Sequence, residues 1–338
     1  MNTSVKNIEW QEKIFSAKKE NFNSLALEAF RFQHENNPVY HRYCNSLNID
    51  VNNIIHIQQI PYLPIQFFKT HQVTTTTFEP AVIFESSGTT QTINSKHFVK
   101  DTGLYEKSFT NTFRSFYGDP DKWCILALLP SYLERNNASL VMMADKLIQQ
   151  SGHPLSGFYL NEWEKLHHTL ATLEKEKQKT LLIGVTFALL DFATVFPMKL
   201  QYTTIMETGG MKGRREELTR DQVHEQLKQR LGLAEIHSEY GMTELLSQAY
   251  SQKNGIFNCP PWMKILLRSE DDPFEIISAN NISKRMATGL INIIDLANIY
   301  SCSFIATDDV GKLYSDGSFE VLGRADNSDV RGCGLMVV

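Results

Sequence analysis

A run of small hydroxyl residues around one glycine is the first feature of the sequence whose side chains could do chemistry. The residues are Ser86, Ser87, Gly88, Thr89 and Thr90. Backbone N–H groups and side-chain hydroxyls around a glycine can surround the oxygens of a phosphate. The loop is not a Walker A motif, because it contains no Gly-Lys-Ser or Gly-Lys-Thr. An ordinary polar turn is the alternative interpretation.

A second group of side chains lies in the segment 237–244, where we expect a strand to end and a helix to start. Glu244 is a hard oxygen ligand that suits Mg²⁺, and Thr243 can donate a hydrogen bond to an anion at the start of a helix. Tyr240, which Gly241 follows, offers a flat face on which a base can stack. The alternative is a helix start at which Thr243 and Glu244 serve the cap and the helix dipole.

Aspartates, glycines and one arginine form a third group between residues 307 and 326. Asp309 follows Thr307 and Asp308, and Arg324 follows Gly323. A carboxylate at the end of a strand can accept hydrogen bonds from both hydroxyls of a ribose. A series of β-hairpins is the alternative, because Asp-Gly is typical of their turns.

The composition of the chain excludes several classes of protein. With 338 residues, 42% of them hydrophobic and 21% charged, the chain can form a large core and is not disordered as a whole. The net charge of −5 argues against a nucleic-acid partner. No run approaches the ~20 apolar residues of a transmembrane segment. The five cysteines include no Cys-x-x-Cys, so we expect neither a zinc site nor a disulfide framework, and a cytoplasmic location.

The elements that would position the three groups follow from hydrophobic periodicity and turn residues. Apolar residues at helical spacing predict one long or two shorter helices across residues 8–35, and three prolines predict a loop-rich stretch after residue 37. Further along, strands alternate with helices, which is typical of parallel βαβ units. We expect strands at 82–84, 123–128, 180–185, 203–207 and 234–238, and helices at 102–117, 138–150, 161–178 and 219–231.

The pattern of the sequence changes after residue 254. Short apolar runs separated by Asp, Asn, Gly and Ser predict antiparallel strands there. We expect these strands at 263–267, 274–278, 289–294, 302–306, 311–314 and 318–322. The predicted fold class is α/β, with a parallel βαβ sheet and an antiparallel β section near the C-terminus. We divide the chain into a helical and loop-rich part (1–79), an α/β part (80–254) and a β-rich part (255–338), packed as one body.

The order and spacing of the three groups resemble those of the adenylate-forming enzymes, which include acyl-CoA synthetases, firefly luciferase and peptide-synthetase adenylation domains. The resemblance runs from residue 80 to residue 334. Within this superfamily, three segments are similar to the acyl-protein synthetases of bacterial luminescence, the LuxE type, and less so to phenylacetate-CoA ligases. These segments are Ile60–Lys69, with the sequence IPYLPIQFFK, the Ser86–Thr90 loop and Asp326–Cys333. The implied fold is the large N-terminal domain of an adenylate-forming enzyme.

The resemblance implies a role for each matching position. The loop Ser86–Thr90 would hold the β- and γ-phosphates of ATP. Thr243 would contact the α-phosphate, and Glu244 would bind Mg²⁺. Tyr240 and Gly241 would form a wall of the adenine pocket.

The remaining matches concern the ribose and the acyl group. Asp309 would bind the ribose hydroxyls, and Arg324 would lie on the ribose or hinge side. Gly209 and Gly210 would form a turn beside the nucleotide and the acyl group. Gln91 departs from the pattern, because the family usually has glycine after the two threonines.

The implied activity is the ATP-dependent, AMP-forming activation of a carboxylic acid, expected to be a fatty acid. The acid would become an acyl-adenylate, and the acyl group would then pass to a protein thiol. The implied cofactors are ATP and Mg²⁺, and the implied catalytic residues are Thr243, Glu244 and Cys333.

Cys333 is the predicted acyl acceptor. Longer relatives carry a further C-terminal subdomain with a catalytic lysine, and we expect none here because the sequence stops soon after Gly334. In the LuxE type, the acyl group passes to a cysteine near the C-terminus and then to a reductase. A neighbouring cation such as Arg331 favours the reactive thiolate. The alternative is a buried cysteine that acts only as a small apolar side chain.

Two other functions stay open. The chain can be an adenylating subunit that hands the acyl group to a separate carrier-protein or coenzyme A thiol. It can also be a degenerate, non-catalytic module that binds nucleotide or acyl groups, for which Gln91 is an argument. The expected partners are a small carboxylic acid and an acyl-accepting protein, either a reductase or a carrier, and no nucleic acid.

Overall fold

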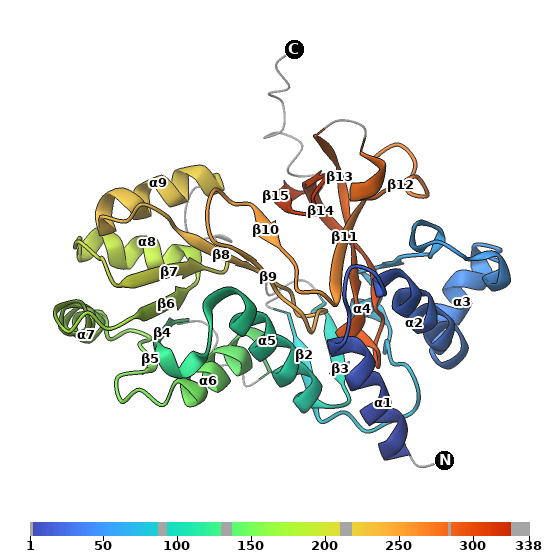
Figure 1. Cartoon of the computed structure of the whole chain (residues 1–338), viewed down its shortest axis with the longest axis horizontal. Coiled ribbons are helices and arrows are strands. Elements are labelled where there is room, and N and C mark those ends of the chain that lie inside the picture. Colours follow the sequence, from blue (N-terminus) through green and yellow to red (C-terminus); the bar gives the residue numbers. More distant parts are fainter. Residues whose placement is uncertain (1–2, 87–92, 130–136, 210–217, 283–284, 326–338) are drawn as a thin grey trace. The chain divides into compact units, whose positions relative to one another are not determined.

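A computed structural model of the chain describes residues 3–86, 93–129, 137–209, 218–282 and 285–325 (Figure 1). The chain folds into two compact units. The first unit comprises Met1–Tyr105, Glu244–Ser247 and Asn258–Val338, and the second comprises Glu106–Thr243 and Gln248–Phe257. In the part of the chain described by the structure, no helix is both long and apolar enough to cross a membrane.

Three helices open the first unit: α1 (Thr3–Phe15), α2 (Phe22–Asn36) and α3 (Pro38–Ser46). The prediction of one or two helices over residues 8–35 is confirmed as two. The loop-rich stretch predicted after residue 37 is wrong at its start, where α3 lies. Pro38 occupies the first turn of α3, where its missing N–H costs no helical hydrogen bond. The Asn37 side chain caps this helix by accepting the N–H groups of Val39 and Tyr40, both at 3.0 Å.

Short elements follow α3: the 3₁₀ turns η1 (Val51–Asn53) and η2 (Ile57–Gln59), β1 (Leu63–Pro64) and α4 (Phe67–Thr70). A hairpin then pairs β2 (Val82–Glu85) antiparallel with β3 (Lys96–Val99). β2 confirms the strand predicted at 82–84, whereas β3 lies where we predict none. α5 (Thr102–Tyr117) confirms the next predicted helix.

The rest of the first unit is an antiparallel sheet. Its strands are β11 (Met263–Arg268), β12 (Ile276–Ile277), β13 (Met286–Asp295), β14 (Phe304–Tyr314) and β15 (Phe319–Arg324). They lie in the order β12-β11-β13-β14-β15, and β1 pairs parallel with β14. The turns η4 (Ala279–Asn281) and η5 (Leu296–Asn298) connect strands of this sheet. This sheet confirms the predicted antiparallel section.

One strand of this sheet corrects the sequence analysis. We predict separate strands at 302–306 and 311–314, but β14 runs through both. Its polar middle stays in the strand because Thr307 and Asp309 are buried and hydrogen-bonded. The irregular pairing between Leu290 and Asn292 of β13 accommodates this stretch as a bulge.

The second unit contains the predicted parallel sheet. Its strands are β4 (Cys124–Leu128), β5 (Gly157–Phe158), β6 (Thr180–Gly184), β7 (Thr203–Glu207) and β8 (His237–Tyr240), with β9 (Ala249–Ser251) antiparallel to β8. The order is β9-β8-β7-β6-β4-β5, and every residue of β4 and β6 is buried. β10 (Phe257–Asn258) and the 3₁₀ turn η3 (Pro120–Lys122) are short additions.

Helices connect the parallel strands, as the alternating pattern predicts. They are α6 (Ser139–Ser151), α7 (Trp163–Lys175), α8 (Thr186–Val195) and α9 (Arg220–Leu231). Gly152 ends α6 with a φ of 62°, which a glycine adopts without strain. The last predicted strand is displaced, because β8 begins at His237, where pairing with Met206 of β7 starts.

Candidate active site

The carboxyl ends of β7 and β8 carry several of the predicted site residues of the second unit. Glu207 and Ser238 are paired across these two parallel strands, and Gly209 and Tyr240 each lie two residues beyond that pair. Ligands of parallel α/β sheets bind at this end of the strands. The structure therefore brings Gly209 and Tyr240 to the end of the sheet where a nucleotide is expected.

A buried carboxylate holds the turn that contains Gly209. Glu207 Oε2 accepts the N–H of Gly209 at 2.8 Å and the hydroxyl of Thr186 at 2.9 Å. Its Oε1 lies 3.7 Å from both Arg220 Nε and His224 Nε2. Burial acts to raise the pKa of Glu207, but the neighbouring His224 and the charge of Arg220 prevail and lower it to about 2. Glu207 is therefore an ionised anchor, and its role was not evident from the sequence.

We expect Glu207→Gln to lower the free energy of unfolding at pH 6 by about 3 kcal/mol. This is the stabilisation that corresponds to a carboxyl pKa lowered from 4.5 to about 2 on folding. A lowered carboxyl pKa stabilises the folded state above pH 4.5, and this contribution is lost as the pH falls towards 2. Urea unfolding of both proteins between pH 6 and pH 3 measures the difference. A deficit of the same size at every pH would indicate a packing defect instead.

Tyr240 and Gly241 lie at the end of β8. Tyr240 is buried, and its ring meets Phe257 edge to face at 5.9 Å between centroids. A Cβ added at Gly241 would meet the carboxylate of Glu239, so a larger residue there would require that side chain to shift. Burial and the neighbouring Glu207 raise the pKa of Glu239 to about 8.

The helix expected after Gly241 does not form. The described chain turns there and returns as β9, with Tyr240 opposite Ala249 in an antiparallel pair. The short return to β9 leaves no room for a helix. Thr243 lies half-buried in this turn. Because no helix follows it, Thr243 has no helix N-terminus from which to bind an anion.

Glu244 belongs to the first unit, where it is 5% exposed. Burial raises the pKa of its carboxyl, while a hydrogen bond with Ser95 and the positive charges of Arg324 and Lys69 oppose that rise. A buried carboxyl with two cations nearby and a hydroxyl partner is suited to an ionic ligand.

Ser95 connects Glu244 to the start of the predicted phosphate loop. The N–H of Ser95 donates to Ser86 Oγ at 2.9 Å, and the N–H of Ser86 donates to the Ser95 carbonyl at 3.1 Å. Ser86 and Glu244, far apart in the sequence, therefore share one neighbour at the end of the β2–β3 hairpin. Neither Ser95 nor Lys69 was predicted as a site residue. Lys69 belongs to the segment Ile60–Lys69, whose resemblance to the LuxE type could have indicated a role for it. No feature of the sequence indicated a role for Ser95.

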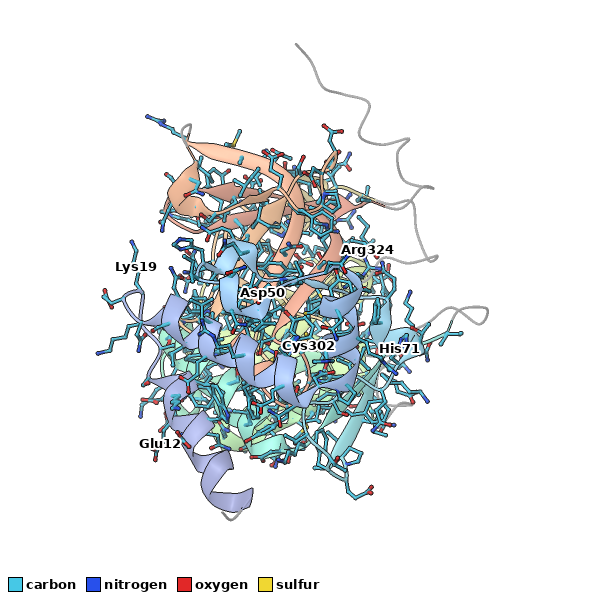
Figure 2. The ribbon with its side chains drawn as sticks, turned by 90° about the vertical axis from the view of Figure 1, so that its right-hand side faces the viewer. Glu12, Lys19, Asp50, His71, Cys302 and Arg324 are labelled. Carbon is cyan, nitrogen blue, oxygen red and sulfur yellow. The ribbon has the colours of Figure 1, made fainter. Side chains whose placement is uncertain are left out.

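Asp309 and Arg324 face each other across β14 and β15. Arg324, labelled in Figure 2 at the end of β15, places its Nε 3.4 Å from Asp309 Oδ1. The hydroxyl of Thr307 accepts the N–H of Asp309 at 3.1 Å, and Arg268 donates to the Thr307 carbonyl at 2.6 Å. Since Arg324 also acts on Glu244, the structure brings three predicted residues together in the first unit.

The cysteines of the described residues are poor nucleophiles. Burial raises the pKa of Cys124 to about 11 and that of Cys44 to about 12, and it raises those of Cys259 and Cys302 further. The buried Cys302, labelled in Figure 2, and Cys124 are core residues. The predicted acceptor Cys333 lies outside the described residues, as do Ser87, Gly88, Thr89, Thr90, Gln91 and Gly210.

Glu244 fits a magnesium ion that is held mainly by substrate. Among the described residues, no group of three or more His, Cys, Asp or Glu side chains could hold a metal by itself. Magnesium is commonly bound by one or two carboxylates together with substrate phosphates. A single buried carboxylate beside the predicted phosphate loop satisfies that requirement.

Comparison with known proteins places the chain in a family. The model of the family described as "Acyl-protein synthetase, LuxE" matches residues 4–338. A long-chain-fatty-acid--luciferin-component ligase from Aliivibrio fischeri is 24% identical, over 96% of this chain and 90% of that protein.

Solved structures share the fold. One is a 2-hydroxyisobutyryl-CoA ligase in its postadenylation state with R3-HIB-AMP, which is 9% identical and superposes with a TM-score of 0.61. The match covers 93% of this chain and 70% of the ligase chain. The R395G mutant of coronafacic acid ligase from Pectobacterium brasiliense matches at 16% identity and a TM-score of 0.45. That match covers 66% of this chain, which spans only 43% of the coronafacic acid ligase. The first likeness confirms the predicted fold class.

The family model matches nearly the whole chain. The low sequence identity to the A. fischeri relative does not weaken that match. The predicted class of enzyme, an AMP-forming ligase that activates a carboxylic acid with ATP, is confirmed with the family. The chain thus belongs to the acyl-protein synthetase family LuxE.

Proposed function

We propose that this enzyme uses ATP and Mg²⁺ to convert a fatty acid into an acyl-adenylate and then transfers the acyl group to its own Cys333. The observation that carries the proposal is the surroundings of Glu244. This buried carboxyl bonds to Ser95, the partner of Ser86, and lies near the charges of Arg324 and Lys69. The name of the A. fischeri relative, a long-chain-fatty-acid ligase, supports a fatty substrate.

The first step joins two anions, so the site must offset their repulsion. Two unit charges 4 Å apart cost about 4 kcal/mol at an effective dielectric constant of ~20. We assign Ser86, Ser87, Gly88, Thr89 and Thr90 to the β- and γ-phosphates. Glu244 would hold Mg²⁺, whose charge would offset that of the phosphates. Lys69 and Arg324 would add positive charge at the same place.

The other assigned residues orient the nucleotide. In the first unit, Asp309, whose carboxylate pairs with Arg324, would accept hydrogen bonds from the ribose hydroxyls. In the second unit, Tyr240 and Gly241 would contact adenine, and Thr243 the α-phosphate. The turn at Gly209 and Gly210 would contact the nucleotide and acyl group. The carboxylate of the acid then attacks the α-phosphorus, and pyrophosphate leaves.

The second step needs a thiolate. The sulfur attacks the acyl carbonyl carbon, a thioester forms, and the bond from that carbon to the phosphate oxygen breaks to release AMP. The thiol proton passes to solvent. Because burial raises the pKa of each described cysteine, Cys333 is the acceptor we assign. An acyl-accepting reductase or carrier as a further partner and a cytoplasmic location remain predictions.

We expect Asp309→Asn to raise the KM for ATP by about 10- to 100-fold, because the ribose hydroxyls then lose the charged group to which they donate. The catalytic rate at saturating ATP should change much less. Asp316→Asn is the matched control, since Asp316 lies in the β14–β15 turn and accepts hydrogen bonds from Ser318 there. An unchanged KM in Asp309→Asn would contradict the ribose assignment.

Exchange of radiolabelled pyrophosphate into ATP tests the proposed first step. The protein is mixed with ATP, Mg²⁺ and acids of varied chain length and aromaticity. We expect exchange only when an acid is present, and fastest with a fatty acid. Absence of exchange with every acid would reject the proposal and favour the non-catalytic binding module.

A further inference from the structure

The segment Glu244–Ser247, which begins with the proposed metal ligand, is held by one buried carboxylate. Asp295, at the end of β13, is fully buried. Its Oδ2 accepts the N–H groups of Leu246 at 2.9 Å and Ser247 at 3.0 Å. Its Oδ1 accepts the Ser247 hydroxyl at 2.6 Å and the N–H of Ala297 at 3.0 Å. These bonds fix the backbone on the C-terminal side of Glu244.

A buried amide holds Glu244 itself. Asn298, in the turn η5, donates from Nδ2 to the carbonyl oxygen of Glu244 at 2.7 Å. Gln33 of α2 secures this turn from the other side by donating to the Asn298 carbonyl at 3.0 Å. Asn298 and Gln33 are both fully buried. The backbone of Glu244 is therefore tied to a turn that is itself anchored to a helix.

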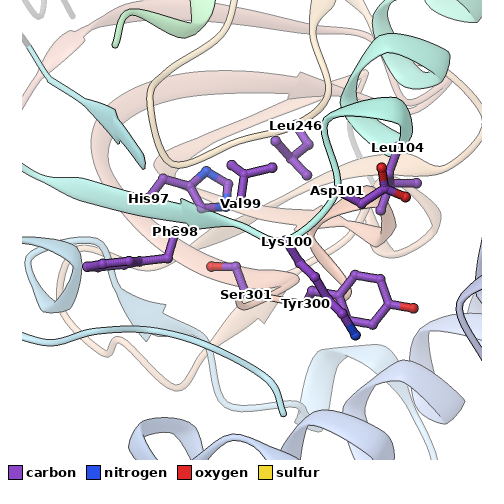
Figure 3. Close-up of a pocket in the computed structure, with 9 residues that line it drawn as sticks. All are labelled: His97, Phe98, Val99, Lys100, Asp101, Leu104, Leu246, Tyr300 and Ser301. Carbon is purple, nitrogen blue, oxygen red and sulfur yellow. The ribbon is translucent and has the colours of Figure 1, made fainter. Parts of the chain in front are cut away.

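Packing leaves the segment little space to move. Leu246 lines a small cavity together with residues of β3 and with Tyr300 and Ser301 (Figure 3). This cavity measures about 10 Å³, which is no more than the space for one water molecule. The same strand, β3, directly follows Ser95, with which the Glu244 carboxyl is hydrogen-bonded.

We propose that Asp295 and Asn298 are positioning residues that set the location of the Glu244 carboxylate for metal binding. Neither side chain needs to contact Mg²⁺ or substrate. Magnesium demands nearly ideal octahedral geometry, so a small displacement of its protein ligand weakens binding. This inference rests on the proposed role of Glu244 as a magnesium ligand.

The test is the dependence of pyrophosphate exchange on Mg²⁺ concentration. We expect Asn298→Ala to raise the Mg²⁺ concentration for half-maximal rate by about 10-fold or more, the usual effect of changing a residue that orients a metal ligand. The rate at saturating Mg²⁺ and the KM for the acid should stay close to those of the unaltered protein. Asp295→Asn should act in the same direction, because its amide keeps one acceptor oxygen and its NH₂ group cannot accept the N–H groups that the second carboxylate oxygen accepts.

Asn37→Ala is the matched control. Asn37 is 1% exposed and belongs to the same unit; it accepts two N–H groups at the start of α3 and donates to the Ser301 carbonyl, with bonds of similar length. It should lower thermal stability without changing the Mg²⁺ dependence. An equal shift in Asn37→Ala would show general destabilisation and overturn the inference. If Asp295→Asn does not fold, Asn298→Ala decides alone.

Glu244→Gln, measured in the same assay, separates the two proposals. If it shifts the Mg²⁺ dependence and the Asn298 and Asp295 variants do not, the positioning inference is wrong and the metal role of Glu244 stands. If Glu244→Gln leaves the dependence unchanged, the metal role is wrong and the inference falls with it. A shift in all three variants, with none in Asn37→Ala, supports both.

Discussion

Glutamine in place of Glu244 is expected to slow pyrophosphate exchange by about 10²- to 10³-fold, the usual effect of removing one electrostatic contact to the transition state. The amide keeps the size of the side chain and its hydrogen bond to Ser95, but it lacks the charge that holds Mg²⁺. Without the ion at that place, the repulsion between the carboxylate and the triphosphate is no longer offset. Initial rates at saturating ATP and acid measure the loss.

Glu320→Gln is the control for this variant. Glu320 lies on β15 of the same unit, where its carboxylate accepts the hydroxyl of Tyr314. It has no assigned role, so exchange should continue at nearly the normal rate. Equal rates in Glu244→Gln and the unaltered protein would contradict the assignment of Glu244.

Serine in place of Cys333 is expected to abolish acylation of the enzyme by its own acyl-adenylate while pyrophosphate exchange continues. The two steps use different groups, because formation of the adenylate needs no nucleophile from the protein. A serine hydroxyl is not ionised at neutral pH, whereas a thiol is partly so. Incubation with ATP and a radiolabelled fatty acid, followed by hydroxylamine, measures acyl groups bound as thioesters.

Cys259→Ser is the matched control for this experiment. Among the described cysteines, Cys259 alone is partly exposed to solvent. The burial that remains still raises the pKa of its thiol well above the ordinary range. Self-acylation should persist in this variant. Labelling that survives Cys333→Ser would show that the thiol role is wrong. Labelling of an added carrier protein or coenzyme A, without self-acylation, would instead support a separate acceptor.

The parallel part of the fold was predictable because its signals are local. The central strands β4 and β6 are short apolar runs, and two of the helices begin or end at recognisable residues. Thr219 caps α9 in a capping box with Gln222, and Gly152 ends α6. The errors occur where tertiary contacts override local signals. The polar middle of β14 reads as a break, but the pairs with β13 on either side of it and the pair of Asp309 with Arg324 of β15 keep the strand continuous.

The candidate site was predictable only in part, for a similar reason. The segment from Tyr240 to Glu244 is recognisable as a motif, but its expected helix is replaced by a return to β9. Ser95 acts on Glu244 only through the folded structure, and Asp295 reaches its partners across 48 residues of sequence. No spacing in the sequence relates such residues, because their contacts depend on how distant strands pack.

The central claim is that this protein activates a carboxylic acid as an acyl-adenylate. Mass spectrometry of a rapidly quenched mixture of the protein, ATP, Mg²⁺ and a saturated long-chain fatty acid such as palmitate tests it most directly. The account predicts acyl-AMP together with pyrophosphate, and no acyl-AMP when the acid is omitted. Formation of ADP with an acyl phosphate, or no nucleotide product with any acid, would contradict it.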